Sequence, residues 1–205
     1  MVEFGQKTVG VAILSAGASS RLGQPKQLVP FRGKPLLQHT IDEAGKIEFT
    51  KKWVILGAYQ KNIKEQVDFN DFQLISNPNW EEGMASSVCL AAMKAQQDGL
   101  DGLLITLSDQ PFVSSELLGQ LLRLYQPGRE SIVSSEYGGT LGVPALFDGF
   151  YYQELTKLSG DAGARKLINT FRTKVKSVNF ERGSLDIDTP KDLKRLNMIE
   201  DAHNN

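Results

Sequence analysis

Two cations, Arg21 and Lys26, stand five positions apart in a segment made mostly of small residues. The segment follows a short apolar run at residues 9–14, a pattern typical of a strand that is buried on both faces. Small residues let backbone amides approach a ligand closely, and the two cations suit a polyanion such as a triphosphate. The segment therefore predicts a phosphate-binding loop, and the alternative is a glycine-rich turn with two solvated cations.

Two carboxylates elsewhere in the chain stand out by their positions. Asp109 directly follows an apolar run at residues 103–107, and Asp188 lies just before Thr189 and Pro190. Mg²⁺ takes oxygen ligands from one or two carboxylates together with phosphates, so Asp109 suits a magnesium site. The alternative for Asp109 is a turn residue or a helix cap. Thr189, Pro190 and Asp192 are explained by a helix start, but this does not explain Asp188.

Composition limits the classes of protein to which the chain can belong. Its 205 residues carry a net charge of −1, with 40% hydrophobic and 23% charged residues, as expected for an ordinary soluble protein. No overall basic field would hold nucleic acid or an acidic membrane surface. The single cysteine, Cys89, excludes an internal disulfide and a multi-cysteine metal cluster. We find no signal core and no membrane-length apolar run, and we expect a cytoplasmic protein.

Strand-like and helix-like segments alternate along the chain, which predicts an α/β layer fold. No linker divides the chain, so we expect one domain over residues 1–205. Two strands joined by a glycine turn near residue 138 predict that the mostly parallel sheet becomes mixed. Strands are expected at residues 9–14, 53–56, 72–75, 103–107, 132–137, 140–147 and 175–179. Helices are expected from 35, at 61–67, 84–97, from about 114 with Ser114 as its cap, and at 151–157, 162–171 and 190–199.

The order of residues in the first loop resembles a known signature. The segment LSAGASSRLGQPKQL is similar to that of the MobA-like nucleotidyltransferases and, more distantly, to that of the sugar-phosphate nucleotidyltransferases. Ser108-Asp109-Gln110-Pro111 matches the family's D-x-P strand end, whose aspartate binds the metal. Asp188 matches a D-x-D/N-T-P-x-D segment. These motifs run in the family's order from about residue 8 to 193, and the resemblance implies a Rossmann-like three-layer α/β/α fold.

The resemblance also implies roles for particular residues. Arg21, Lys26 and Asp109 are expected to be catalytic. Asp109 and Asp188 are expected to bind a metal ion, which is Mg²⁺ or, as the alternative, Mn²⁺. The expected nucleotide-binding residues are Ser15, Ala16, Gly17, Ala18, Ser19, Ser20, Arg21, Gly23, Lys26, Ser86, Ser87 and Ser108. A G-D-x-G-A-R segment and a G-x-P turn imply acceptor binding by Gly142, Pro144, Gly160, Asp161 and Arg165, with Asp161 also a helix cap. Val143 departs from the polar residue that many members carry there.

Within this family, Ser15-Ala16-Gly17 and Ser108-Asp109-Gln110-Pro111 are closer to the cytidylyl-transferring branch than to the guanylyl branch. The resemblance therefore implies transfer of CMP from CTP to the terminal phosphate of molybdopterin cofactor, with release of pyrophosphate. The product would serve xanthine dehydrogenase-type enzymes and thus purine catabolism, with a transient handover to such an apo-enzyme. The alternatives are guanylyl or other nucleotidyl transfer to molybdopterin or to a sugar or polyol phosphate, and a non-catalytic cofactor carrier.

Overall fold

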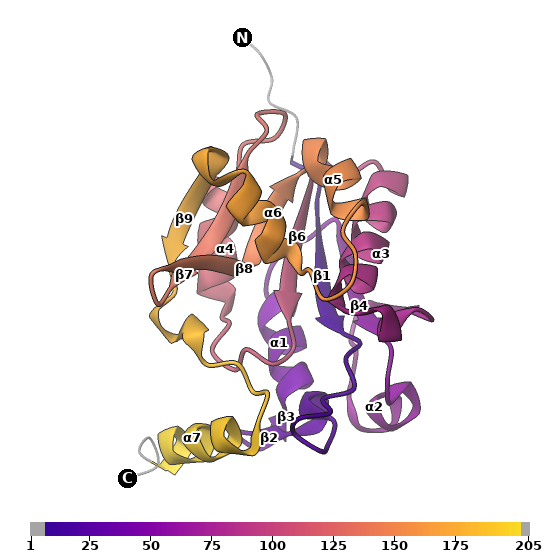
Figure 1. The fold of residues 1–205 in the computed structure, drawn as a ribbon, viewed down its shortest axis with the longest axis vertical. Coiled ribbons are helices and arrows are strands. Elements are labelled where there is room, and N and C mark those ends of the chain that lie inside the picture. Colours follow the sequence, from indigo (N-terminus) through magenta and orange to yellow (C-terminus); the bar gives the residue numbers. More distant parts are fainter. Residues whose placement is uncertain (1–6, 202–205) are drawn as a thin grey trace.

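A seven-stranded sheet runs through the centre of the computed structural model, which describes residues 7–201. Its strand order is β5-β4-β1-β6-β8-β7-β9, and β2 and β3 form a separate two-stranded hairpin (Figure 1). Only β8 runs antiparallel to its neighbours in the large sheet, so the sheet is mostly parallel but mixed, as predicted. The strands are β1 (Val9–Ser15), β2 (Pro30–Phe31), β3 (Lys34–Pro35), β4 (Lys51–Leu56), β5 (Gln73–Ser76), β6 (Gly102–Leu107), β7 (Ile132–Tyr137), β8 (Thr140–Asp148) and β9 (Val175–Asn179).

The helices connect these strands and cover both faces of the sheet. They are α1 (Leu36–Gly45), α2 (Gln60–Gln66), α3 (Met84–Gln97), α4 (Ser115–Leu124), α5 (Tyr152–Thr156), α6 (Ala164–Thr170) and α7 (Pro190–Asp201), with short 3₁₀ turns between several elements. In Figure 1, α3, α5 and α6 lie in front of the sheet, while α1 and α4 lie behind it. No helix among residues 7–201 is both long and apolar enough to span a membrane.

Alternation along the central strand β1 creates the layers. Val11 and Ile13 pack into one hydrophobic cluster with α1 and α4, while Ala12 and Leu14 pack into a second cluster with α3, α5 and α6. Successive side chains of a strand point to opposite faces, so an unbroken apolar strand supplies both cores at once. The sheet is therefore the middle layer of an α/β/α fold.

The order of the strands reverses beside β1. From β1 the chain proceeds outward to β4 and β5 on one side, and β6 returns to pair with β1 on its other side. In open α/β sheets, ligands bind beyond the carboxyl ends of the strands at such a switch point. Leu14 pairs with Leu107 at this end, so the loops after β1 and β6 leave the sheet next to each other.

A third, smaller hydrophobic cluster holds the C-terminal helix against the β2–β3 hairpin. Leu196 of α7 and Ile187 of the preceding segment are fully buried in this cluster. They pack with Phe31 of the hairpin and Leu22 of the first loop. Figure 1 shows α7 beside β2 and β3, below the main sheet. This cluster fixes the segment that carries Asp188 beside the glycine-rich loop.

Several local predictions are confirmed at the residue level. The Ser114 hydroxyl accepts a hydrogen bond from the Leu117 amide at 3.3 Å and caps α4. Thr189 and Asp192 exchange hydrogen bonds of 2.7 to 3.3 Å at the start of α7, which is a capping box. The prediction that Asp161 caps a helix is wrong, because α6 begins at Ala164 after Gly163 and has no side-chain cap.

Candidate functional site

A cleft of about 410 Å³ opens at the switch point of the sheet. One wall is the loop after β1, and the opposite wall is the segment after β6 together with the segment before α7. Ser15 and Ser108 lie at the base, where their hydroxyls are 3.0 Å apart. The cleft is lined by Leu14, Ser15, Ala16, Gly17, Ala18, Ser19, Ser20, Arg21, Lys26, Gln27, Trp80, Glu81, Gly83, Met84, Ser87, Leu107, Ser108, Asp109, Asp161 and Asp188.

Lys26 joins the two carboxylates across this cleft. Its Nζ forms ion pairs with Asp109 Oδ2 and, at 2.8 Å, with Asp188 Oδ1. Burial by itself lowers the pKa of the Lys26 ammonium, but the charges and hydrogen bonds of Asp109 and Asp188 outweigh burial and raise this pKa above its ordinary value. Lys26 therefore stays protonated at neutral pH. Arg21, whose side chain is largely exposed, reaches Asp188 Oδ2 at 3.1 Å from the same loop.

The donor set of these carboxylates fits a hard divalent cation. Asp109 Oδ1 is buried and has no hydrogen-bond partner among the described residues, so the more buried of these two carboxylates has one oxygen without a protein partner. Both carboxylates contact the same ammonium, which places their oxygens within reach of a single ion. Within residues 7–201, no group of three or more acidic, histidine or cysteine residues forms a metal cluster. Phosphate and water oxygens would complete the coordination of Mg²⁺ or Mn²⁺.

Gln27 holds the glycine-rich loop in place. Its side chain is fully buried, and its Nε2 donates hydrogen bonds to the backbone oxygens of Ser15 at 3.1 Å and Gly17 at 3.0 Å. The Ser19 hydroxyl accepts a hydrogen bond from the Lys26 amide at 3.1 Å, which closes the loop on itself. These contacts leave the side of the loop that lines the cleft free for a ligand.

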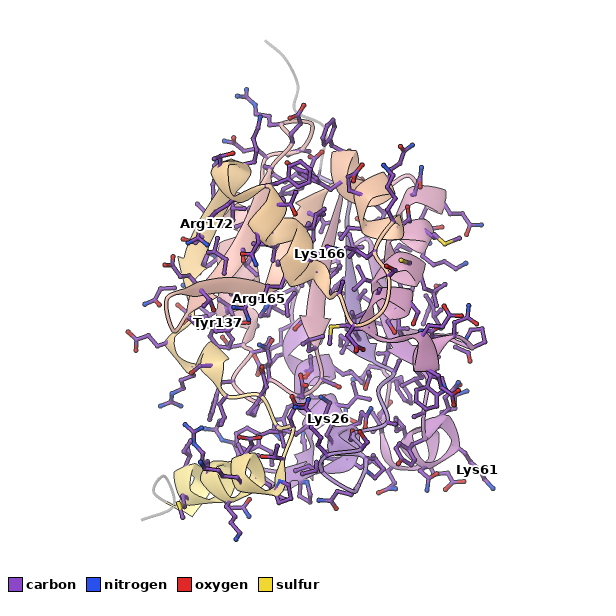
Figure 2. The ribbon with its side chains drawn as sticks, viewed as in Figure 1. Lys26, Lys61, Tyr137, Arg165, Lys166 and Arg172 are labelled. Atoms are coloured by element: carbon purple, nitrogen blue, oxygen red, sulfur yellow. The ribbon has the colours of Figure 1, made fainter. Side chains whose placement is uncertain are left out.

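A second cavity of about 230 Å³ adjoins the cleft and shares Leu14, Met84 and Leu107 with it. Most of its lining is apolar, and its polar side chains come from Tyr137 and Arg165, which lie close together in Figure 2, and from Asp186. Lys26 lies below this pair in the same view. Its full lining is Leu14, Met84, Val88, Ile105, Leu107, Tyr137, Gly142, Val143, Gly163, Ala164, Arg165 and Asp186.

Asp186 has an unusual environment for a carboxyl group. Burial, followed by the nearby charge of Asp109, raises the pKa of Asp186 to about 6. Its Oδ1 is buried without a hydrogen-bond partner among the described residues. Burial and the Asp186 charge also raise the pKa of the Tyr137 hydroxyl, which therefore stays protonated at neutral pH.

The structure brings most of the predicted site residues together and places others elsewhere. Gly23 forms a turn outside the cleft, with its amide donating to Ser19 O at 3.1 Å. Ser86 and Gly160 line a separate cavity of about 350 Å³ on the other side of the α3 start. Pro144 is buried within β8 and lines neither the cleft nor the second cavity.

The predicted acceptor residues divide between the two spaces. Gly142 and Arg165 line the second cavity, whereas Asp161 lines the main cleft. The close approach of two glycines explains this position: a Cβ on Gly83 would lie 2.4 Å from Gly160 O and 2.8 Å from Asp161 Oδ1. The loop before α6 therefore folds over the start of α3 and carries Asp161 into the cleft.

Sequence reasoning missed several residues that shape the site. Gln27 lies in a 3₁₀ turn (Lys26–Leu28), and its side-chain amide lies under the loop. A glutamine between Lys26 and apolar residues was the available signal. Glu81 forms part of the cleft wall, and Gln110 is buried beside Tyr137 and Asp186.

The loop of small residues and the two carboxylates thus line one cleft at the switch point of an α/β sheet, an arrangement that suits a phosphate-bearing ligand with a divalent cation. The family model described as the MobA-like NTP transferase domain matches residues 11–177. The chain belongs to this family.

Known proteins are similar to nearly the whole chain. Nicotine blue oxidoreductase from Paenarthrobacter nicotinovorans is 29% identical over 90% of this chain and 94% of its own length. Purine catabolism protein PucB from Bacillus subtilis is 29% identical over 90% and 93%. A crystal structure of Rv0371C from Mycobacterium tuberculosis H37Rv, a complex with manganese, is 28% identical with a TM-score of 0.74 and covers 93% of this chain and 97% of that chain.

Proposed function

We propose that this protein transfers CMP from CTP to the terminal phosphate of molybdopterin cofactor and releases pyrophosphate. The observation that carries the proposal is the arrangement of Lys26, which links Asp109 to Asp188 opposite a loop of small residues. A cationic loop facing carboxylates at one cleft suits a triphosphate that carries a divalent cation. Membership of the MobA-like family supports the reaction class.

The nucleotide would lie along the first loop. Backbone amides of residues 15–21, together with Arg21 and Lys26, would contact its phosphates, and Ser87 at the first turn of α3 would lie near the ribose. The choice of CTP rests on Ser15-Ala16-Gly17 and on Ser108-Asp109-Gln110-Pro111. The acceptor would occupy the second cavity, with its phosphate directed toward the shared residue Leu14 and the cleft.

The chemistry requires little from a protein base. The acceptor phosphate is already anionic at neutral pH, so it can attack the α-phosphorus of the nucleotide in line without losing a proton to the enzyme. A divalent cation held by Asp109 and Asp188 would reduce repulsion between the two phosphates. Arg21, Lys26 and the loop amides would stabilise the charge that develops on pyrophosphate as it leaves.

The name of the Bacillus relative supports a place in purine breakdown, where the cytidylylated cofactor would serve a xanthine dehydrogenase-type enzyme. The manganese complex of the mycobacterial protein supports a divalent cation at this site, Mg²⁺ or Mn²⁺.

A pyrophosphate assay that crosses CTP, GTP and ATP with molybdopterin, with and without Mg²⁺, tests the proposal. We expect release with CTP, molybdopterin and Mg²⁺ together. Asp109→Ala is expected to abolish turnover, and Lys26→Ala to lower it by a factor of about a hundred or more, because charge stabilisation at the leaving group is lost. Normal pyrophosphate release by Asp109→Ala would contradict the assignment. Release with GTP but not with CTP would instead indicate that the protein transfers a guanylyl group.

A second candidate function comes from the name of the Paenarthrobacter relative, which is an oxidoreductase. Under this alternative, the same cleft would hold a nicotinamide dinucleotide by its pyrophosphate. Oxidation of NADH or NADPH with nicotine blue as the acceptor, followed by absorbance, tests it directly. Substrate-dependent oxidation together with no pyrophosphate release from any nucleotide would favour this alternative.

A further inference from the structure

Buried polar atoms without partners gather where the cleft meets the second cavity. Six buried side-chain atoms have no hydrogen-bond partner among the described residues, and four of them belong to Asp109, Gln110 and Asp186. Each such atom costs on the order of 1–3 kcal/mol when it is left unsatisfied, so the cluster favours a polar environment at this junction. The Gln110 amide lies beside both Asp186 and Tyr137, which ties this cluster to the second cavity.

Asp186 and Asp188 serve different spaces although they are two positions apart. Asp188 lines the cleft and pairs with Arg21 and Lys26, whereas Asp186 lines the second cavity. Between them, the Ile187 amide donates a hydrogen bond to Asp109 O at 3.1 Å, and the Ile187 side chain is fully buried. This anchor fixes the position of both carboxylates. Asp186 is then a carboxylate held in place in the wall of an otherwise mostly apolar cavity.

The second cavity has a size and a lining that suit a flat ring. Leu14, Val88, Ile105, Leu107 and Val143 supply apolar walls, and its volume of about 230 Å³ suits a fused bicyclic heterocycle. A carboxylate in such walls favours a ring that presents N–H donors to it, because carboxylate oxygens only accept hydrogen bonds. The edge formed by the 2-amino group and the ring N3–H of a pterin has this pattern.

We propose that Asp186 is a specificity-determining residue that accepts hydrogen bonds from the amino–amide edge of a pterin-like acceptor ring in the second cavity. This inference rests on the proposed function for the acceptor, and it assigns the part of the acceptor that the reaction itself does not involve. The ring would lie against the walls shared by the two spaces, Leu14 and Leu107, and its phosphate-bearing substituent would extend toward Lys26.

The experiment compares two small fluorescent probes, pterin and lumazine. Pterin carries an amino group at ring position 2, whereas lumazine carries an oxygen there and a proton on N1. Binding is measured by equilibrium dialysis at neutral pH without nucleotide. The native protein is expected to bind pterin roughly tenfold more tightly than lumazine, as the loss of a charge-assisted hydrogen bond implies. Asp186→Asn presents an N–H donor in place of one oxygen, so it is expected to lose this preference and to bind lumazine more tightly than the native protein does.

Glu136→Gln is the matched control, because Glu136 is an exposed carboxylate beside Tyr137 that lines neither space and accepts from Ser177 at 2.7 Å. It is expected to keep the preference for pterin. Melting temperatures of all three proteins establish that they are folded. Equal binding of the two probes by the native protein, no binding of either probe, or an unchanged preference in Asp186→Asn would overturn the inference.

The two proposals fail separately. Pyrophosphate release with CTP and molybdopterin, combined with no preference for pterin, would overturn the role of Asp186 alone. A preference for pterin that depends on Asp186, in a protein that releases no pyrophosphate from any nucleotide, would instead overturn nucleotidyl transfer.

Discussion

At the scale of single residues, the defining feature is that Lys26 contacts the same carboxylates that suit a divalent cation. The side chain of Asp109 is 7% exposed and that of Lys26 is 18% exposed, so water screens this ion pair weakly. An ammonium and a metal ion cannot both occupy the space between Asp109 and Asp188. Nucleotide phosphates offer the ammonium another partner, which would couple nucleotide binding to metal binding.

Lys26→Met is therefore expected to bind Mn²⁺ in the absence of nucleotide more tightly than the native protein, by about tenfold, because the competing charge is gone and Asp109 is left unpaired. Free Mn²⁺ is measured by its electron paramagnetic resonance signal. Lys52→Met is the control, since Lys52 is a similarly buried lysine that pairs with Asp71 at 2.8 Å and lines neither the cleft nor the second cavity. Weaker or unchanged Mn²⁺ binding by Lys26→Met would show that the ammonium does not compete with the cation.

At the scale of elements, the start of α3 and the loop before α6 depend on each other. Gly83 has a φ of +101° and faces Gly160 O so closely that no side chain fits between them. The Ala85 amide also donates to Gly160 O at 3.0 Å. This contact forms the wall that carries Asp161 into the cleft and separates the cleft from the cavity lined by Ser86.

Gly83→Ala is expected to lower the free energy of unfolding by at least about 1–3 kcal/mol, because the new Cβ meets backbone and φ is strained. It is also expected to weaken nucleotide binding, since the wall of the cleft must shift. Urea unfolding and calorimetric titration with CTP measure the two effects. Gly45→Ala, at the end of α1 with open space around it, is expected to be neutral or stabilising. Equal effects of the two substitutions would contradict this explanation.

The C-terminal helix α7 is the second element on which the site depends. Leu196 is fully buried in the small cluster that also holds Ile187. Leu196→Ala is expected to lower the free energy of unfolding by about 2–4 kcal/mol and to weaken Mn²⁺ binding, because Asp188 is less firmly held. Met198→Ala, on the exposed side of the same helix, is expected to change stability by less than about 0.5 kcal/mol. If the Leu196→Ala protein is destabilised but binds Mn²⁺ as the native protein does, then the packing of α7 does not hold Asp188 in place.

Local patterns in the sequence were sufficient to predict most elements. The apolar runs of β1 and β6, the residues of α3 and the Ser114 cap depend on neighbours within a few positions, and these predictions are confirmed. In parallel α/β sheets, the loops that follow the strands lie at the carboxyl edge of the sheet, where ligands bind. The loop and Asp109 could therefore be paired from the sequence.

Contacts between distant parts of the chain could not be predicted in the same way. The Lys26–Asp188 ion pair joins residues 162 positions apart, and the cluster of α7 with the hairpin joins both ends of the chain. The role of Gln27 was missed for a similar reason, because its partners are backbone oxygens of a folded loop. Asp161 was assigned to the acceptor from its motif alone, whereas the packing of Gly83 on Gly160 decides its position.

At the scale of the whole molecule, the sheet brings two kinds of charge to one edge. The protein is close to neutral overall, yet the loop after β1 carries Arg21 and Lys26 while the segments after β6 and before α7 carry Asp109 and Asp188. The two hydrophobic layers hold these loops in a fixed relation because β1 contributes to both. The proposed nucleotide with its cation would lie between these charges, and the second cavity, which shares Leu14, Met84 and Leu107 with the cleft, would hold the acceptor.

The most direct test of this account follows the α-phosphate itself. CTP radiolabelled at that phosphate is incubated with molybdopterin, Mg²⁺ and either the native protein or Asp109→Asn, and labelled products are separated by chromatography. The native protein is expected to move the label onto molybdopterin, and Asp109→Asn is expected to do so at least about a hundredfold more slowly. Label that stays in CTP with the native protein, or equal transfer by Asp109→Asn, would contradict the account.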